Sequence, residues 1–416
     1  MKNLNKLIQG LFLKFVSLRD AKRRSNLRVK RLLRPYGLAM TAIFFILISP
    51  TLSFTEDNNP LNIKGYYKNL FTTTRSFDTK EGIYADIHRL RIELDKQISP
   101  GWQAYLTLDN EAIINDFANT SDFDFIRSRT QDATVAVDLD KTSVDNDHLY
   151  LKHAIHRAFL KYYNPQFQAV LGKQGVDWGI LRFYSPLDVF NPVGALDLER
   201  DERIGIDAVN LNFSPQSLAG INLVAAPGED AENSRYGVKF YKTLGTYDFS
   251  IIAATIRKDI IGGFAFDGYL KKAGLRGEIT YNQLDSNRAF ARVGVGLDYS
   301  FSDKFYVLFE QFYNGGHDDN SATALASSYR TSAQLLSLQK HLSNLWLRYK
   351  LTPLIELNNY LIYDWDGQSV VVNPEIKYNI FKNLDLSFGA QLYWGDETSE
   401  FGLFNHLFYI QLKWYF

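Results

Sequence analysis

The residues with the clearest potential for chemistry are His341 and Ser343, which lie two positions apart in a segment that ends at Asn344. Residues at positions i and i+2 share one face of a β-strand, so the imidazole could serve as a base for the serine hydroxyl in ester hydrolysis. Such a nucleophile also needs a third group that orients the base, and the sequence offers no persuasive one. Two polar side chains at a strand end are the simpler interpretation, and we predict that the chain is not an enzyme.

A second candidate site is an acidic segment between residues 113 and 148. Four aspartates lie within ten residues of this segment, and their carboxylate oxygens could bind Ca²⁺. The residue spacing of an EF-hand loop and its glycine are absent, however. We therefore predict a solvated acidic loop, no metal site and no cofactor. No basic patch typical of nucleic-acid binding follows the first 35 residues. The aspartates concerned are Asp138, Asp140, Asp145 and Asp147.

Most charged side chains instead fall at every second position of segments whose other positions are apolar. Arg89, Arg91 and Glu93, for example, alternate with Leu90 and Ile92. Such alternation is typical of a strand with one wet and one apolar face, and a buried cation in lipid costs about 2–4 kcal/mol. The charged faces should therefore line a water-filled lumen. The predicted lumen-lining residues are Arg89, Arg91, Glu93, Asp109, Glu111, Arg157, Lys161, Lys173, Arg276, Glu278, Arg292, Asp298, Arg348, Glu375, Lys377 and Lys413.

The elements that carry these residues are short β-strands. A tilted membrane strand needs about 9–11 residues, and each segment is long enough. Short turns and long links alternate between the segments, as in bacterial barrels with both termini in the periplasm. We predict an all-β, antiparallel transmembrane barrel of about eighteen strands, with sixteen as the alternative. The segments are approximately 61–74, 84–98, 101–112, 149–163, 166–178, 205–214, 217–226, 234–244, 246–257, 260–271, 273–283, 289–301, 304–314, 342–351, 354–365, 369–380, 383–394 and 403–416.

The first 53 residues have a different composition from the rest of the chain. Residues 1–35 carry eleven Lys and Arg and one acid, and a short apolar run centred on 42–48 follows them. A basic region, a short apolar region and small residues near Ser53 are typical of a signal peptide. A retained inner-membrane anchor is less favoured, because the run is short for a membrane span. We predict a signal peptide at 1–53, a barrel at 54–416 and a location in the outer membrane.

The chain ends inside a strand whose one face is apolar throughout. An apolar alternation that stops at a terminal Phe resembles the C-terminal signature of bacterial outer-membrane barrels. The resemblance implies an assembly signal recognised by the barrel-assembly machinery. The residues of this face are Phe408, Ile410, Leu412, Trp414 and Phe416.

The link at 179–204 is rich in proline, aspartate and asparagine, which favour an ordered loop. It follows the Gly172-Lys173-Gln174 element, and the two together resemble a strand and loop of porin-like proteobacterial barrels; the element itself resembles one of alginate-export-type barrels. The link could fold into the lumen and narrow it, or it could be a solvated external loop, and the sequence leaves both open. The predicted constriction residues are Arg182, Asp188, Asp197, Glu199, Arg200, Asp201, Glu202 and Arg203.

These features predict a porin-like channel for the passive passage of small hydrophilic or anionic solutes. One alternative is an outer-membrane lipid esterase, because His341-x-Ser343-Asn344 resembles an element of outer-membrane phospholipases and lipid A deacylases. A structural or adhesive barrel is the other. The predicted partners are outer-membrane lipid, lipopolysaccharide, the assembly machinery and small hydrophilic solutes, with no nucleic acid; the oligomeric state is open.

Overall fold

In the computed structural model, all the strands named below belong to one unit of the chain. The predicted signal peptide at 1–53 lies outside the described residues. The residues that the structure describes are 61–76, 79–117, 120, 122–123, 139–191, 194–198, 205–216, 218–228, 232–317, 339–397 and 399–416.

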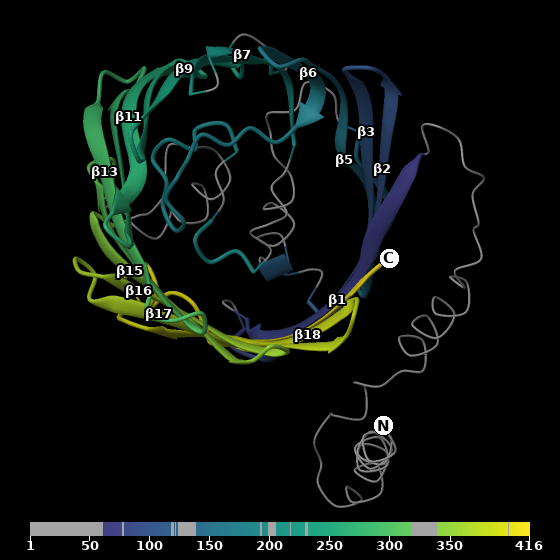
Figure 1. Ribbon diagram of the computed structural model, residues 1–416. Helices are drawn as coiled ribbons and strands as arrows, with labels where there is room; N and C mark the ends of the chain where they lie inside the picture. The colour runs from purple at the N-terminus through teal and green to yellow at the C-terminus, as the bar shows by residue number, and fades with distance from the viewer. Residues whose placement is uncertain are drawn as a thin grey trace, which may run out of the picture. The chain divides into compact units, whose positions relative to one another are not determined.

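Eighteen antiparallel strands of the described chain form a closed barrel, as predicted (Figure 1), and β4 is a short additional strand that pairs with β5. Among the described residues, no helix is long and apolar enough to cross a membrane. The strands are β1 (Asn62–Arg75), β2 (Gly82–Ser99), β3 (Trp102–Asn115), β4 (Lys141–Asp145), β5 (Leu149–Tyr163), β6 (Phe167–Gln174), β7 (Ile206–Gln216), β8 (Ala219–Ala226), β9 (Arg235–Leu244), β10 (Tyr247–Ile256), β11 (Asp259–Leu270), β12 (Ala273–Gln283), β13 (Ala289–Ser300), β14 (Phe305–Asn314), β15 (His341–Thr352), β16 (Ile355–Asp364), β17 (Ser369–Phe381), β18 (Leu384–Trp394) and β19 (Leu407–Tyr415).

The barrel closes where β1 pairs with β19. The register runs from Tyr66 opposite Tyr415 to Thr73 opposite Phe408. The last residue extends this seam, because Phe416 and Gly65 exchange two backbone hydrogen bonds of 3.0 Å. Closure gives every edge strand a partner, and a barrel in hydrocarbon requires this.

Side chains alternate between an apolar outer face and a polar or packed inner face. On β13, Val295 and Leu297 are 45% and 47% exposed on the outside. Arg292, on the inner face of the same strand, is 1% exposed. The terminal strand shows the same arrangement, because Phe408 and Ile410 are 52% and 45% exposed.

Three places differ by four residues or more from the sequence-based prediction. The last strand, β19, begins at Leu407 and not at 403. β4 lies inside the segment at 113–148 that was expected to be a loop. The strand is short and pairs only with the outer end of β5, so its sequence pattern is weak. β6 ends at Gln174 and not at 178. Beyond Gln174 the backbone amide of Val176 donates to the side chain of Asn191 at 2.8 Å, so the chain leaves the wall there.

The chain that leaves β6 enters the barrel. Figure 1 shows this part of the chain in teal inside the ring of strands. We call its described residues, 175–191 and 194–198, the inner segment. The largest buried apolar cluster joins the inner segment, through Trp178, Leu187 and Phe190, to the inner faces of β7, β8, β10 and β11.

Candidate functional site

The inner segment is anchored to the barrel wall by Glu278 of β12. One carboxylate oxygen accepts the backbone N–H groups of Ile180 and Leu181, the second of these at 3.0 Å. The other oxygen accepts the N–H of Leu187 at 3.0 Å, and the hydroxyl of Ser185 donates to both oxygens. Glu278 is 3% exposed, so a single wall carboxylate satisfies four donors of the segment away from bulk water.

A second wall carboxylate, Glu310 of β14, binds the next two residues of the segment in a similar way. Its two oxygens accept the backbone N–H groups of Arg182 and Phe183 at 2.8 and 2.9 Å. Glu310 is 2% exposed and lies on the inner face between Leu308 and Phe312. Glu278 and Glu310 are therefore the loop-anchoring carboxylates of this barrel.

The side chain of Arg182 extends from the inner segment to β15 and β16. Its guanidinium carbon lies 3.9 Å from the ring centre of Trp346, within the range of a cation–π contact. An N–H of the same group donates to the hydroxyl of Tyr360 at 3.1 Å. The backbone of the segment is also tied further along the wall, because Gln391 of β18 donates to the carbonyl of Leu196 at 2.7 Å.

Close packing fixes the segment between these polar contacts. Trp178 and Phe190 meet edge to face, with ring centres 4.9 Å apart. The indole N–H of Trp178 donates to Asn222 of β8 at 2.8 Å. Gly294 leaves room for Leu181 at the wall, because a Cβ at position 294 would lie 2.1 Å from a methyl carbon of Leu181 and would displace that side chain.

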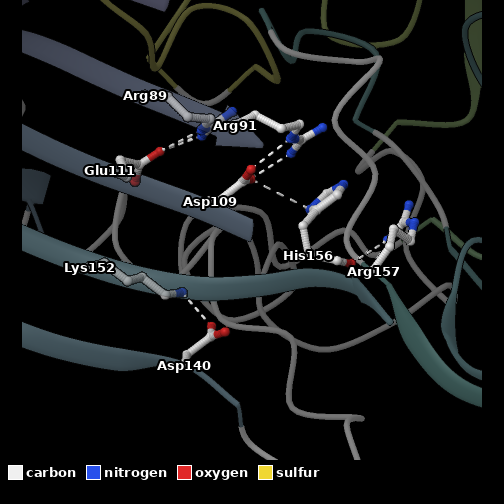
Figure 2. A network of polar contacts seen from close by, with 8 residues as sticks. All are labelled: Arg89, Arg91, Asp109, Glu111, Asp140, Lys152, His156 and Arg157. Carbon is white, nitrogen blue, oxygen red and sulfur yellow. Dashed lines mark hydrogen bonds and ion pairs between the residues drawn. The ribbon is translucent and has the colours of Figure 1, made fainter. Parts of the chain in front are cut away.

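The facing wall, made by β2, β3 and β5, carries a ladder of ion pairs (Figure 2). Arg91 binds Asp109 through two parallel bonds of 2.6 and 2.5 Å, and Arg89 binds Glu111 through Nε at 3.1 Å. His156 Nδ1 lies 3.8 Å from Asp109, so this carboxylate faces two basic groups. Farther out on β5, Lys152 pairs with Asp140 at 2.6 Å.

A cavity of about 610 Å³ lies beside the inner segment, toward the ends of β9 and β10 that are joined by a short turn. Its wall contains both apolar and polar side chains, and the amides of Asn212 and Asn222 and the hydroxyl of Tyr241 belong to the polar part. Lys239 supplies an ammonium group to the same wall. A space with these donors and acceptors suits a hydrated solute better than an apolar one.

The predicted site residues divide into three groups. Of the constriction residues, Arg182, Asp188 and Asp197 belong to the inner segment, and Asp188 is only 5% exposed. The other five (Glu199, Arg200, Asp201, Glu202 and Arg203) lie outside the described residues. The predicted lumen-lining residues other than Lys173 share the inner face by the register of their strands.

The lumen-lining role of Lys173 stays a prediction. The preceding residue, Gly172, pairs with Phe159 and Ala208, but its φ of +121° interrupts the regular alternation of faces at this point. Lys173 is 6% exposed, whereas Leu171, on the outer face two residues earlier, is 58% exposed. Lys173 is therefore not part of the exposed outer surface.

Four residues of the site were missed: Glu310, Trp346, Tyr360 and His156. Glu310 had a usable signal, because a single acid on an otherwise apolar inner face requires partners other than bulk water. His156 had none, because it sits in a β-bulge of β5, where the alternation of faces is interrupted.

The His341 and Ser343 pair lies on the outer face, as expected, but each side chain has a different partner. Ser343 donates to Gln311 at 2.6 Å and accepts the indole N–H of Trp365 at 2.8 Å. His341 Nδ1 lies 3.1 Å from Asp366 in the turn after β16. Burial raises the pKa of Asp366, but hydrogen bonds from the side chain and backbone of His341 outweigh it and lower the pKa below its usual value.

Comparison with known proteins identifies the fold. OccAB1 of Acinetobacter baumannii superposes with a TM-score of 0.55 at 10% identity, covering 88% of this chain and 98% of that one. The chain has a porin-like barrel fold. A triple mutant of the Rhodopseudomonas blastica porin superposes with a TM-score of 0.45 at 12% identity, covering 86% of this chain and 100% of the porin. No protein-family model matches the chain, and no curated protein matches its sequence.

Proposed function

We propose that this protein is an outer-membrane channel for small hydrophilic solutes, and that the inner segment is its constriction. The observation that carries the proposal is the anchoring of the segment inside the lumen by Glu278 and Glu310, which lie on the same wall. A barrel that served only as a wall or an adhesive surface would not need an ordered segment held inside a charged lumen. The similarity of fold to OccAB1 supports a channel, and the amide, hydroxyl and charged groups of the cavity beside the segment support a hydrated solute.

The solute class is set by the balance of charge along the path. Arg89 and Arg91 are already paired with acids of β3, so they supply little net positive field. Arg182 adds a positive charge on the inner segment. The cavity is lined by two lysines, Lys239 and Lys242, and by three acids, Asp177, Asp248 and Asp267, so its wall carries both signs and does not by itself favour an anionic solute. The kinship to porin-like and alginate-export-type barrels, suggested by the glycine-rich element before the segment, is part of this proposal.

The proposal extends to export and assembly. Residues 1–53 would be removed as a signal peptide, and sequencing the N-terminus of the mature protein tests this. The outer face of β19, ending at Phe416, would be recognised by the barrel-assembly machinery, and the finished barrel would contact lipid and lipopolysaccharide. Deletion of Phe416 should then lower the amount of heat-modifiable, folded barrel in the outer membrane.

Conductance in planar bilayers tests the channel and its constriction together. The wild-type protein should form discrete ion-conducting steps. Replacing residues 185–203 with a short Gly/Ser linker should raise the single-channel conductance, because the anchored chain no longer occupies the lumen. Absence of any steps from folded wild-type protein would contradict the channel, and unchanged conductance of the variant would contradict the constriction.

A further inference from the structure

The cavity beside the inner segment contains a lysine that forms no bond within the described chain. Lys239 lies on the inner face of β9 and pairs in register with Asn222, which accepts the indole N–H of Trp178. The field of Asp177 and Glu278 reaches Lys239, but neither carboxylate forms an ion pair with it. Among the described residues its ammonium makes no hydrogen bond either. All three of its donors are therefore available to a solute.

Two acids line the same cavity and lie side by side on its wall. Asp248 of β10 and Asp267 of β11 are direct partners in the register of the two strands. Asp248 accepts the hydroxyl of Thr243. Asp267 lies 3.9 Å from Arg276, whose closer ion pair is with Asp298. Like charges directly opposite each other destabilise a strand pair, so this pair of carboxylates would be stabilised by a further cation.

The lysine and the two acids lie at different heights along the wall. Asp248 pairs with Thr243, which follows Lys239 by four residues on β9, and this corresponds to about 13 Å of strand. Between these heights the inner face carries the small side chains of Ser250 and Ala265, which pair with each other. The hydroxyl of Ser250 forms no hydrogen bond among the described residues. The result is a polar hollow with a cation at one end and carboxylates at the other.

This separation of charge differs from the arrangement on the facing wall. There, Arg91 binds Asp109 directly, and Lys152 binds Asp140 at 2.6 Å. In the cavity, both signs are present but are held apart. A solute with one charge would satisfy only one end of such a hollow, and a neutral sugar would leave both ends without a counter-charge. A solute that carries both charges would satisfy both ends, through charge-assisted hydrogen bonds.

We propose that the cavity is a binding site for zwitterionic solutes of the size of a dipeptide. Lys239 binds the carboxylate of the solute, and Asp248 and Asp267 bind its ammonium group. Ser250 offers a hydroxyl to the part of the solute between its two charges. The volume of about 610 Å³ is in the range of sites for small ligands, about 300–1,000 Å³. This inference rests on the proposed channel function and names the class of solute that the channel takes.

Solute-dependent block in planar bilayers tests the site, because a solute bound in the lumen reduces the single-channel current saturably. Four probes separate the classes of charge. Glycylglycine carries both charges, N-acetylglycine only the carboxylate, glycinamide only the ammonium group, and sucrose neither. Glycylglycine should give saturable block, and the other three should reduce the current only in proportion to their concentration. Saturable block by sucrose, by one of the singly charged probes alone, or equally by all four would overturn the proposal.

Variants of the charged groups locate the block within the lumen. Lys239→Gln and Asp248→Asn should each raise the half-saturating concentration of glycylglycine by about tenfold or more, the loss expected for one hydrogen bond to a charged group. The matched control is Lys350→Gln, because Lys350 lines a different cavity, and it should leave this concentration unchanged. Lys239→Glu makes the ends of the hollow alike in charge, so it should lose block by glycylglycine and gain block by glycinamide. An equal loss in the control would contradict the site.

Heat-modifiable mobility and conductance steps without probe show that each variant is folded. If Lys239→Gln does not fold, Asp248→Asn and the four probes on wild-type protein decide. The absence of steps from folded wild-type protein would contradict the channel itself. Normal steps without saturable block by glycylglycine would contradict only the binding site, so the two failures are distinguishable.

Discussion

The two walls of the lumen use acidic side chains in opposite ways. On β3, Asp109 and Glu111 neutralise arginines of the neighbouring strand, and the result is a ladder of ion pairs within the wall itself. On β12 and β14, Glu278 and Glu310 bind backbone N–H groups of the inner segment, and the result is a fixed piece of chain inside the barrel. The same residue type therefore sets local charge on one side and the position of the segment on the other.

This difference determines what a solute meets. A carboxylate that accepts several hydrogen bonds and is 2–3% exposed is not accessible for direct contact with a cation in the lumen. The number of acids on an inner face is therefore a poor guide to the selectivity of this barrel. Glu278 and Glu310 act through the segment they hold, as positioning residues.

The largest expected effect comes from removing a loop-anchoring carboxylate. Glu278→Leu leaves the N–H groups of Ile180, Leu181 and Leu187 without their acceptor, at a cost of about 1–3 kcal/mol each. The inner segment should detach, so we expect a higher single-channel conductance and greater current noise in planar bilayers.

The matched control is Glu375→Leu, which removes an inner-face acid bound to Tyr409 of β19. It should leave conductance noise near the wild-type level. Similar changes in both variants would mean that the segment is held by packing alone and that the comparison between the walls fails.

A smaller effect is expected on the opposite wall. Asp109→Asn breaks the two-bonded pair with Arg91, whose side chain is 8% exposed, and breaking a buried pair costs about 3–5 kcal/mol. We expect a lower midpoint of urea unfolding in micelles and a reversal potential shifted toward anions, with little change in conductance noise. Asp109→Glu keeps the charge and should retain the wild-type selectivity. Detachment of the inner segment in Asp109→Asn would show that the two walls are not independent.

Arg182 tests whether the segment contributes charge as well as bulk. Arg182→Gln removes the contact with Trp346, worth about 0.5–2 kcal/mol, and should lower the permeability ratio of anions to cations modestly. The control is Arg348→Gln, because Arg348 contacts the same ring at 5.5 Å but belongs to the wall strand β15. A larger shift from Arg348 than from Arg182 would place the charge filter on the wall.

Most of the barrel could be predicted because each strand shows its two faces in its own sequence. The alternation of Val295 and Leu297 with inner-face residues repeats in each strand, and a charge on the wrong face is expensive. The seam could likewise be predicted from the apolar face that ends at Phe416. The pattern gave no assignment where alternation is interrupted, as in the β-bulge at His156.

The site was less predictable than the wall, because its contacts join distant parts of the chain. Glu278 could be assigned to the inner face, but its partners lie about one hundred positions away, from Ile180 to Leu187. Period-two patterns give the direction of a side chain and not what it meets there. The described anchors of the segment include wall acids bound to backbone N–H groups, and a pattern of side-chain charges does not reveal such contacts.

The smallest effect is expected at Ser343, on the outer rim. Its hydroxyl proton is directed to the amide oxygen of Gln311, and His341 is engaged by Asp366, so the geometry lacks the serine–imidazole bond of an activated nucleophile. The lowered pKa of Asp366 keeps its carboxylate charged, so the contact with His341 is present above the ordinary aspartate pKa and is lost only as pH falls through the lowered value. We expect no release of fatty acid from phospholipid or lipid A in mixed micelles, with or without Ca²⁺, and an unchanged conductance for Ser343→Ala. Fatty-acid release that Ser343→Ala abolishes would show instead that the outer rim, and not the lumen, carries the activity of this barrel.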